Sequence, residues 1–300
     1  MSVPLVENAP AKVNLTLRVL GRRADGYHEI ESLVAFADFG DTLSLSPAPD
    51  LTLDVRGPAA EQADSGSENL VLRAARALAA TIPDLRVGAF QLDKILPVAA
   101  GLGGGSADAA AALRLLARAN DLAGNDERLY EAARKIGADV SVCLETRCRL
   151  MRGIGEILGE PLDLAILPAL LVNPCAALAT KDVFAGWTPV AAPAMLAPLD
   201  VSVAGRAANR EHLLQLLAAQ TNDLELPAMA LAPSIADVLV ALRGLPGCRL
   251  ARMSGSGATC FALFLAAPEA MAAAKIVGSR FPQWWVRATA LRDGTTAAVH

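Results

Sequence analysis

The chain has 300 residues, of which 53% are hydrophobic and only 4% aromatic, so its core must consist mainly of Ala, Leu and Val. The formal net charge is −4 and no run of Lys or Arg stands out, which argues against a nucleic-acid partner. The longest apolar stretch, Leu164 to Ala179, is interrupted by two prolines and is too short to span a membrane. There is no secretory signal, and the five cysteines form no CxxC pair, so we expect a cytoplasmic protein with reduced thiols.

The first hundred residues indicate short antiparallel strands. Apolar and polar residues alternate from Val13 to Val19, which predicts a strand with one buried face. A turn at residues 23–26 leads into a second strand from Ile30 to Phe36. Further strands are expected over Thr42 to Ser46, Leu51 to Val55 and Val87 to Leu92, and helices over Asn69 to Ala80, Ser106 to Ala119 and Asp126 to Ile136.

The second half has a similar character. A Pro/Ala-rich loop is expected from Trp187 to Leu199. Strands are expected over Ile166 to Val172, Arg249 to Met253, Cys260 to Leu265 and Trp285 to Leu291, and helices over Arg210 to Ala219, Ser234 to Arg243 and Pro268 to Ser279. Strands and helices without regular βαβ alternation favour an α+β fold, which we divide into domains 1–160 and 161–300.

A glycine-rich segment, Gly101-Leu102-Gly103-Gly104-Gly105-Ser106, lies between a predicted strand and a predicted helix. Without Cβ atoms the backbone can approach a ligand closely, and a helix that begins near Ser106 adds unpaired N–H groups and its dipole. This arrangement predicts an anion site, and a triphosphate is the obvious anion. The Ser106 hydroxyl could also bind a phosphate oxygen or a metal-bound water. The alternative is a tight turn in which Ser106 is an ordinary N-cap.

Better-known nucleotide motifs are absent. A P-loop requires a Gly-Lys pair, which occurs nowhere in the chain. A dinucleotide fingerprint that starts at Gly101 would need glycine where Ser106 stands, and the GxSxG element of serine hydrolases is missing too.

Phosphoryl transfer requires bound phosphates, cations and a carboxylate that accepts the proton of the acceptor hydroxyl. Asp139 follows a predicted helix and precedes an apolar stretch, so we expect it at the rim of a buried turn. Lys12 opens the first strand and could keep Asp139 ionised or neutralise the transferring phosphate. On position alone, a turn aspartate and a solvated lysine remain the simpler interpretations.

Two further segments could shape a pocket. Tyr27 and His28 could form a stacking and hydrogen-bonding wall for a flat base, although a lone histidine is more often structural or exposed. Residues 253–259, with the sequence MSGSGAT, join two apolar strands as a β-turn or as a second glycine-serine nest.

Residues 10–15, 97–107 and 254–258 together resemble the GHMP small-molecule kinases. The string Arg23-Ala24-Asp25-Gly26-Tyr27-His28-Glu29 narrows the resemblance to GHMP kinases that phosphorylate a cytidine-diphosphate-linked methylerythritol, and the segments Gly137-Ala138-Asp139-Val140 and Gly153-Ile154-Gly155-Glu156 agree with it. The resemblance spans residues 9 to about 260. It implies an N-terminal domain like ribosomal protein S5 domain 2, a ferredoxin-like C-terminal domain, and a site in the cleft between them.

The resemblance also implies a reaction: ATP with Mg²⁺ phosphorylates the 2-hydroxyl of the acceptor, a step of non-mevalonate isoprenoid synthesis. Asp139 is then the general base and Lys12 its electrostatic partner, while Asn14 orients the erythritol part. Tyr27 and Phe184 sandwich the cytosine and His28 bonds to its edge. Around ATP the resemblance places Asn69, Leu70, Lys94, Pro97, Val98, Ala99, Ala100, Gly101, Leu102, Gly103, Gly104, Gly105, Ser106 and Ala107. No protein ligand to the metal is assigned, and we expect a monomer or a weak homodimer.

Two positions depart from the family pattern: Ser141 stands where proline is usual, and Asp108 stands where asparagine is frequent. Two alternatives stay open. One is a GHMP kinase with a homoserine, mevalonate or sugar acceptor. The other is a nucleotide-binding sensor that kept the fold without the chemistry.

Overall fold

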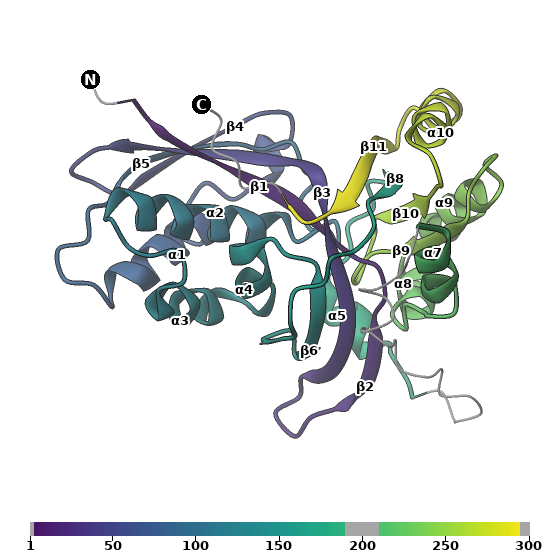
Figure 1. The fold of residues 1–300 in the computed structure, drawn as a ribbon, viewed down its shortest axis with the longest axis horizontal. Coiled ribbons are helices and arrows are strands. Elements are labelled where there is room, and N and C mark those ends of the chain that lie inside the picture. Colours follow the sequence, from purple (N-terminus) through teal and green to yellow (C-terminus); the bar gives the residue numbers. More distant parts are fainter. Residues whose placement is uncertain (1–2, 190–209, 295–300) are drawn as a thin grey trace.

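The protein is represented by a computed structural model that describes residues 3–189 and 210–294. In this part of the chain eleven strands form one sheet, and the helices gather in two groups at its two ends (Figure 1). The mixture of layers confirms the α+β class.

The sheet of the first half is built around one long strand. β3 (His28–Pro47) has 20 residues. Within the first half it pairs antiparallel with four strands, β1 (Leu5–Asn14), β2 (Arg18–Arg22), β5 (Gly88–Asp93) and β6 (Arg149–Gly153). β4 (Thr52–Arg56) pairs parallel to β5, and β7 (Ile157–Leu158) pairs with β6.

The prediction of separate strands over 30–36 and 42–46 is wrong, because the polar stretch between them stays inside the sheet. Asp41 is fully buried, and Gly40 lies against the backbone of β1, where a Cβ would meet the Ala9 carbonyl oxygen at 2.0 Å. The alternation from Val13 to Val19 likewise spans a break, since β1 ends at Asn14 and β2 begins at Arg18.

Four helices cover one face of this sheet: α1 (Leu70–Ala79), α2 (Gly104–Ala119), α3 (Glu127–Ile136) and α4 (Ala138–Glu145). A 3-10 turn, η1 (Ala60–Gln62), precedes them. The side chains of Asn69 and Asp126 cap α1 and α3 by accepting backbone N–H groups, as helix-start signals predict.

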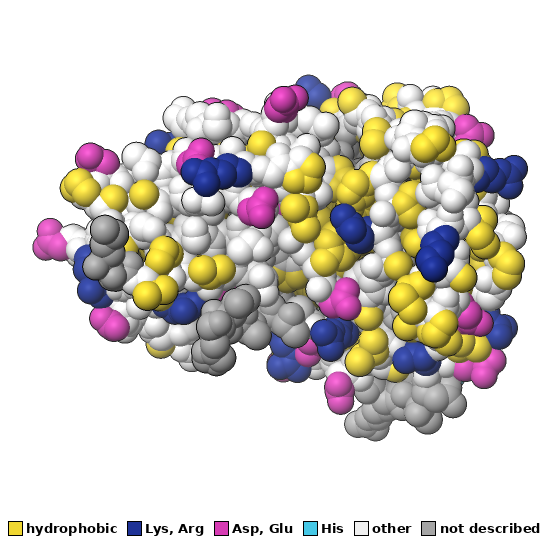
Figure 2. Space-filling model, turned by 90° about the horizontal axis from the view of Figure 1, so that it is seen from above, with side chains coloured by type: hydrophobic (Ala, Val, Ile, Leu, Met, Phe, Trp, Pro, Cys, Tyr) yellow, Lys and Arg dark blue, Asp and Glu magenta, His cyan; other side chains and the backbone are white. Residues whose placement is uncertain are grey.

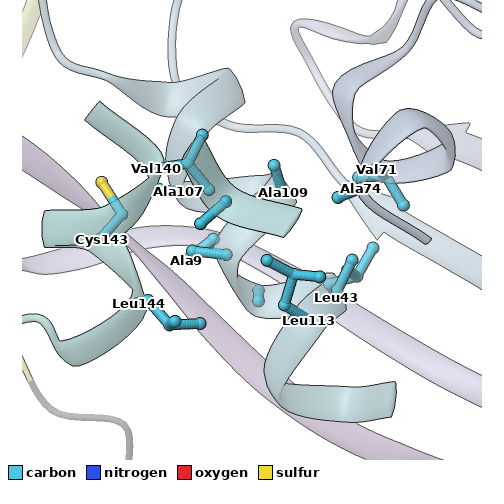
Figure 3. Packing of buried hydrophobic residues seen from close by; sticks show 14 of the residues in the cluster. Ala9, Leu43, Val71, Ala74, Ala107, Ala109, Leu113, Val140, Cys143 and Leu144 are labelled. Atoms are coloured by element: carbon cyan, nitrogen blue, oxygen red, sulfur yellow. The ribbon is translucent and has the colours of Figure 1, made fainter. Parts of the chain in front are cut away.

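Alanine lets these helices pack closely. α2 buries five alanines between Ala107 and Ala112, with Asp108 among them. Its side chains meet those of α1, α4 and the sheet (Figure 3). The scarcity of aromatic residues is therefore compensated by short distances between backbones.

The second half adds four strands and five described helices. The strands are β8 (Leu167–Asn173), β9 (Leu250–Met253), β10 (Cys260–Leu263) and β11 (Trp285–Arg292). The helices are α5 (Thr180–Ala185), α7 (Arg210–Ala218), α8 (Glu225–Leu231), α9 (Ser234–Arg243) and α10 (Ala267–Arg280). Five of the elements, α4, β6, β7, α5 and α8, are not among those expected from the sequence. Residues 190–199 of the expected Pro/Ala-rich loop lie outside the described residues.

The order β8-α9-β9-β10-α10-β11 along the chain and β11-β8-β10-β9 across the sheet is a ferredoxin-like arrangement, as expected. β11 joins the two halves, because it pairs with β8 over seven positions and with β3 at Leu291 and Arg292. The domain division at residue 160 stays a prediction; it falls in residues 159–166, which have no regular structure.

On the face shown in Figure 2, Lys and Arg side chains are interspersed with acidic and apolar ones. Among the helices of the described residues, none has the length and apolar character needed to cross a membrane.

Candidate active site

A cavity of about 1270 Å³ is lined by segments from both halves of the chain. Its walls are the glycine loop, the end of β1, the β2–β3 hairpin, the first turn of α4, α5 and the turn at residues 254–258. Fourteen of the residues expected in the site line it: Lys12, Asn14, Tyr27, His28, Leu70, Ala99, Ala100, Gly101, Gly103, Gly104, Gly105, Ser106, Asp139 and Phe184.

The glycine loop delivers the N-terminus of α2 to this cavity. The helix begins at Gly104, and Gly103 is its N-cap with a left-handed φ of 61°. Ser106 is therefore in the first turn and is not the N-cap, which removes that alternative. The N–H groups of the first turn have no partner inside the helix, and they face the cavity with the positive end of the helix dipole. This geometry suits a phosphate group.

Gly101 has a second role, which is packing. Its φ is 75°, and a Cβ would lie 2.5 Å from the Ser254 carbonyl oxygen. Ser254 joins three segments, because its hydroxyl donates to the Gly101 carbonyl at 2.9 Å and accepts the Asn14 N–H at 3.1 Å. The glycine loop and the Ser254 turn thus form one unit.

Lys12 and Asp139 meet at the edge of the cavity. Lys12 Nζ donates to Asp139 Oδ2 at 2.8 Å, and the lysine side chain is almost completely buried while the carboxylate is about one-third exposed. Gly103 leaves room for the lysine stem, since a Cβ there would lie 3.2 Å from Lys12 Cβ.

The sequence suggested that Asp139 lies in a turn between elements. In the structure it belongs to a helix, the first turn of α4, whose N-cap is Gly137. The carboxylate therefore lies at the positive end of the α4 dipole. Two helix N-termini, those of α2 and α4, face the same cavity. Ser141, which stands in the place of the usual proline, is buried in α4, and its hydroxyl has no hydrogen-bond partner in the described structure.

Asn14 presents an unused acceptor. Its Nδ2 donates to Ser32 Oγ at 2.7 Å, but its buried Oδ1 has no hydrogen-bond partner in the described part of the chain. A buried acceptor without a donor is costly, and a ligand hydroxyl would satisfy it. This favours the expected place of Asn14 beside a polyol.

Aromatic side chains gather where the β2–β3 hairpin and the α5 segment line the cavity. The His28 and Phe184 rings stack with centroids 5.1 Å apart, and Trp187 approaches His28 edge-on at 5.7 Å. Burial, with a smaller effect of Arg22, lowers the pKa of His28, so its imidazole is neutral near pH 7 and can both donate and accept. Tyr27 is 61% exposed.

Trp187 was missed as a site residue. The signal was present, because the chain has few aromatic residues and two of them, Phe184 and Trp187, lie three positions apart.

Six of the expected ATP residues do not line the cavity: Asn69, Lys94, Pro97, Val98, Leu102 and Ala107. Asn69 is occupied as the cap of α1, with its side-chain oxygen accepting the Val71 N–H at 2.9 Å.

The expected place of Lys94 at the adenine end differs from its position in the structure. A buried ammonium needs hydrogen-bond acceptors and a counter-charge, and Lys94 Nζ donates to Asp41 Oδ2 at 2.6 Å and to Asp108 Oδ2 at 2.5 Å. Asp41 Oδ1 also accepts the N–H groups of Ile95 and Leu96. The cluster lies under the first turn of α2, where a Cβ at Gly104 would be 3.2 Å from Lys94 Nζ. Lys94 therefore supports the glycine loop from below.

In the described residues no group of three or more His, Cys, Asp and Glu side chains could hold a metal ion. A Mg²⁺ ion would fit here in the way it often binds in kinases, on substrate phosphates with few protein ligands. The Ser106 hydroxyl in the first turn of α2 is available to a metal-bound water.

Comparisons with known proteins agree with this geometry. Residues 69–146 match the GHMP kinases N terminal domain and residues 195–282 the GHMP kinases C terminal domain. A protein of Rhodopseudomonas palustris named 4-diphosphocytidyl-2-C-methyl-D-erythritol kinase is 55% identical over 291 residues, which cover 96% of this chain and 95% of that protein. One of Methylorubrum extorquens with the same name is 54% identical over 97% of this chain and 100% of its own.

Solved structures extend the match. A crystal structure of 4-(cytidine 5'-diphospho)-2C-methyl-D-erythritol kinase has a TM-score of 0.77 at 33% identity, over 97% of this chain and 100% of that one. A homoserine kinase from Cytophaga hutchinsonii has a TM-score of 0.72 at 20% identity, over 98% and 96%, which shows the shared fold alone. Because more than half of its residues are identical to those of these two relatives over nearly the full length, the chain belongs to the 4-diphosphocytidyl-2-C-methyl-D-erythritol kinase family of the GHMP kinases.

Proposed function

We propose that this GHMP kinase transfers the γ-phosphate of ATP to the 2-hydroxyl of 4-diphosphocytidyl-2-C-methyl-D-erythritol, a step of non-mevalonate isoprenoid biosynthesis. Membership of the family makes the chain an ATP-dependent small-molecule kinase. The observation that carries the proposal is the Lys12–Asp139 ion pair, which lines the same cavity as the N-terminus of α2 and an aromatic wall of Tyr27, His28, Phe184 and Trp187.

Asp139 accepts the proton of the 2-hydroxyl as that oxygen attacks the γ-phosphorus, and ADP leaves with the bond between the β-phosphate oxygen and the γ-phosphorus broken. Lys12 holds the carboxylate in place through their ion pair and balances the charge that develops on the transferred group. Mg²⁺, carried on the ATP phosphates, would neutralise part of their charge. A hydroxyl of the polyol donates to Asn14 Oδ1 and so orients the acceptor.

The base of the acceptor lies against the aromatic wall. Phe184 and Tyr27 offer ring faces for stacking, and the neutral His28 offers a donor and an acceptor for a base edge. Trp187 extends this wall. A cytoplasmic location and a monomer or weak homodimer stay predictions.

The test is ADP release from Mg²⁺-ATP with the cytidyl acceptor, for wild-type protein and for Asp139→Asn. Removing a general base lowers kcat by roughly 10²–10⁴-fold, while ATP binding should persist. Asp237→Asn is the matched control, because Asp237 is an exposed carboxylate on α9 away from the cavity. Robust turnover by Asp139→Asn would overturn the mechanism, and a preference for homoserine, mevalonate or a sugar would overturn the acceptor.

A further inference from the structure

The charges that line the cavity do not balance. Five lining residues carry a charge near pH 7: Lys12, Arg22, Asp25, Asp139 and Lys181. Lys12 pairs with Asp139, and Asp25 pairs with Arg23 at 3.4 Å. In the described part of the chain, no ion pair involves Arg22 or Lys181, so these two cations face the cavity without a counter-charge.

Both cations lie beside the aromatic wall. Arg22 is the register partner of His28 across the β2–β3 hairpin, and its charge helps to lower the pKa of that histidine. Lys181 lies one turn before Phe184 on α5, on the same face of the helix. Because His28 stacks on Phe184, Arg22 and Lys181 approach one aromatic group from two different elements.

The first turns of α2 and α4 come from other segments of the chain. Arg22 and Lys181 thus lie on the same two segments as His28 and Phe184, the β2–β3 hairpin and α5, whereas Lys12 and the helix N-terminus that we propose for ATP belong to β1 and α2. A diphosphate that links two alcohols carries one negative charge on each phosphate. The guanidinium of Arg22 can bind one phosphate with two N–H groups, and the ammonium of Lys181 can bind the other as a point charge.

We propose that Arg22 and Lys181 bind the diphosphate of the acceptor and so make the enzyme selective for a nucleoside diphosphate over the free nucleoside. This inference rests on the proposed function, because it takes the base of the acceptor to lie against His28 and Phe184. The two residues are specificity determinants and take no part in the proton transfer.

The test compares the affinities for CDP and cytidine by calorimetry, on the full chain saturated with a non-hydrolysable ATP analogue so that CDP cannot occupy the ATP site. Arg22→Gln and Lys181→Met should each weaken CDP binding by about tenfold and leave cytidine binding unchanged. Arg134→Gln is the control for loss of one arginine, since Arg134 pairs with Glu127 on α3 and does not line the cavity. Lys275→Met, at an exposed position on α10, is the control for loss of one lysine.

The outcomes separate this inference from the proposed function. If wild-type protein phosphorylates the cytidyl acceptor but both variants keep the preference for CDP over cytidine, the diphosphate assignment is wrong and the function stands. Wild-type protein that binds neither ligand would overturn both. Weaker binding of the ATP analogue with unchanged CDP binding would assign the two cations to ATP and also overturn the inference.

Discussion

Asp108 is the residue whose protonation matters most beneath the glycine loop. It is fully buried beside Lys94, which also holds Asp41. Burial raises the pKa of Asp108 to about 8, with repulsion by Asp41 adding to the effect and Lys94 opposing it. Asp41 is the better-stabilised carboxylate, because two backbone N–H groups also donate to it.

This gives a prediction for stability. The unfolded Asp108 carboxyl titrates near 3.8 and the folded one near 8, so the native state binds an additional proton between these values. The free energy of unfolding should therefore fall as the pH rises from 4 to 8, with a slope on the order of 1 kcal/mol per pH unit. Asp108→Asn, which cannot titrate, should lack this slope. Urea unfolding of the wild-type and Asp108→Asn proteins at pH 6 and pH 8.5 measures this slope. The same change in unfolding free energy with pH in both proteins would contradict the prediction.

At the scale of single residues, the candidate site residues that could be predicted from the sequence stand in recognisable short motifs. Lys12, Asn14, Asp139 and Tyr27 lie within such motifs. Asp41 and Trp187 do not. The role of Asp41 depends on Lys94, more than 50 residues away, and that of Trp187 depends on His28, more than 150 residues away. A pattern within a short window carries no information about such contacts.

The glycine loop is the element on which the site depends, and its glycines are not equivalent. Gly101→Ala would force a side chain into a left-handed conformation and against two carbonyl oxygens, those of Ser254 at 2.5 Å and Gly257 at 2.7 Å. We expect a loss of about 2 kcal/mol or more and weaker ATP binding, because both loops must move apart.

For a second glycine, which lies within a helix, we expect substitution by alanine to change stability in the opposite direction. Gly278 lies in α10, and a Cβ there would meet no atom within 4 Å. Gly278→Ala should stabilise the protein by about 0.5–1 kcal/mol and leave activity unchanged. Thermal unfolding of the Gly101→Ala and Gly278→Ala variants measures both changes in stability. Equal stability of Gly101→Ala and wild type would contradict the packing role of the loop.

Elements with strong local signals were predicted well. α9 begins and ends at the expected residues, and α3 begins after its aspartate cap and ends before Gly137 as expected. Errors arose where tertiary contacts override the local pattern. β3 continues through Gly40 and Asp41 because β1 pairs with it there. α4 follows α3 after a single glycine, where the sequence suggested a turn.

At the scale of the whole molecule, the two halves share a core. One buried cluster contains Val13 and Leu33 from the first half with Leu171 and Phe261 from the second. β11 extends the sheet across the same junction by pairing with β3 and β8. Hydrophobic burial and sheet pairing that cross the proposed division at residue 160 should make unfolding a single cooperative event.

Buried cysteines report on each half separately. Cys143 in α4 and Cys260 in β10 are inaccessible, and burial raises the pKa of both thiols, so each reacts only after the protein opens. Thiol labelling at increasing urea concentrations, followed by mass spectrometry, measures the free energy of opening at each site. We expect the same value for Cys143 and Cys260. The exposed Cys175 should react at once and is the internal control. Labelling of Cys260 at clearly lower urea than Cys143 would show that the second half unfolds alone, and the cavity would then lie between two independently stable units. A common value would instead mean that any substitution in the shared core weakens the ATP end and the acceptor end of the site together.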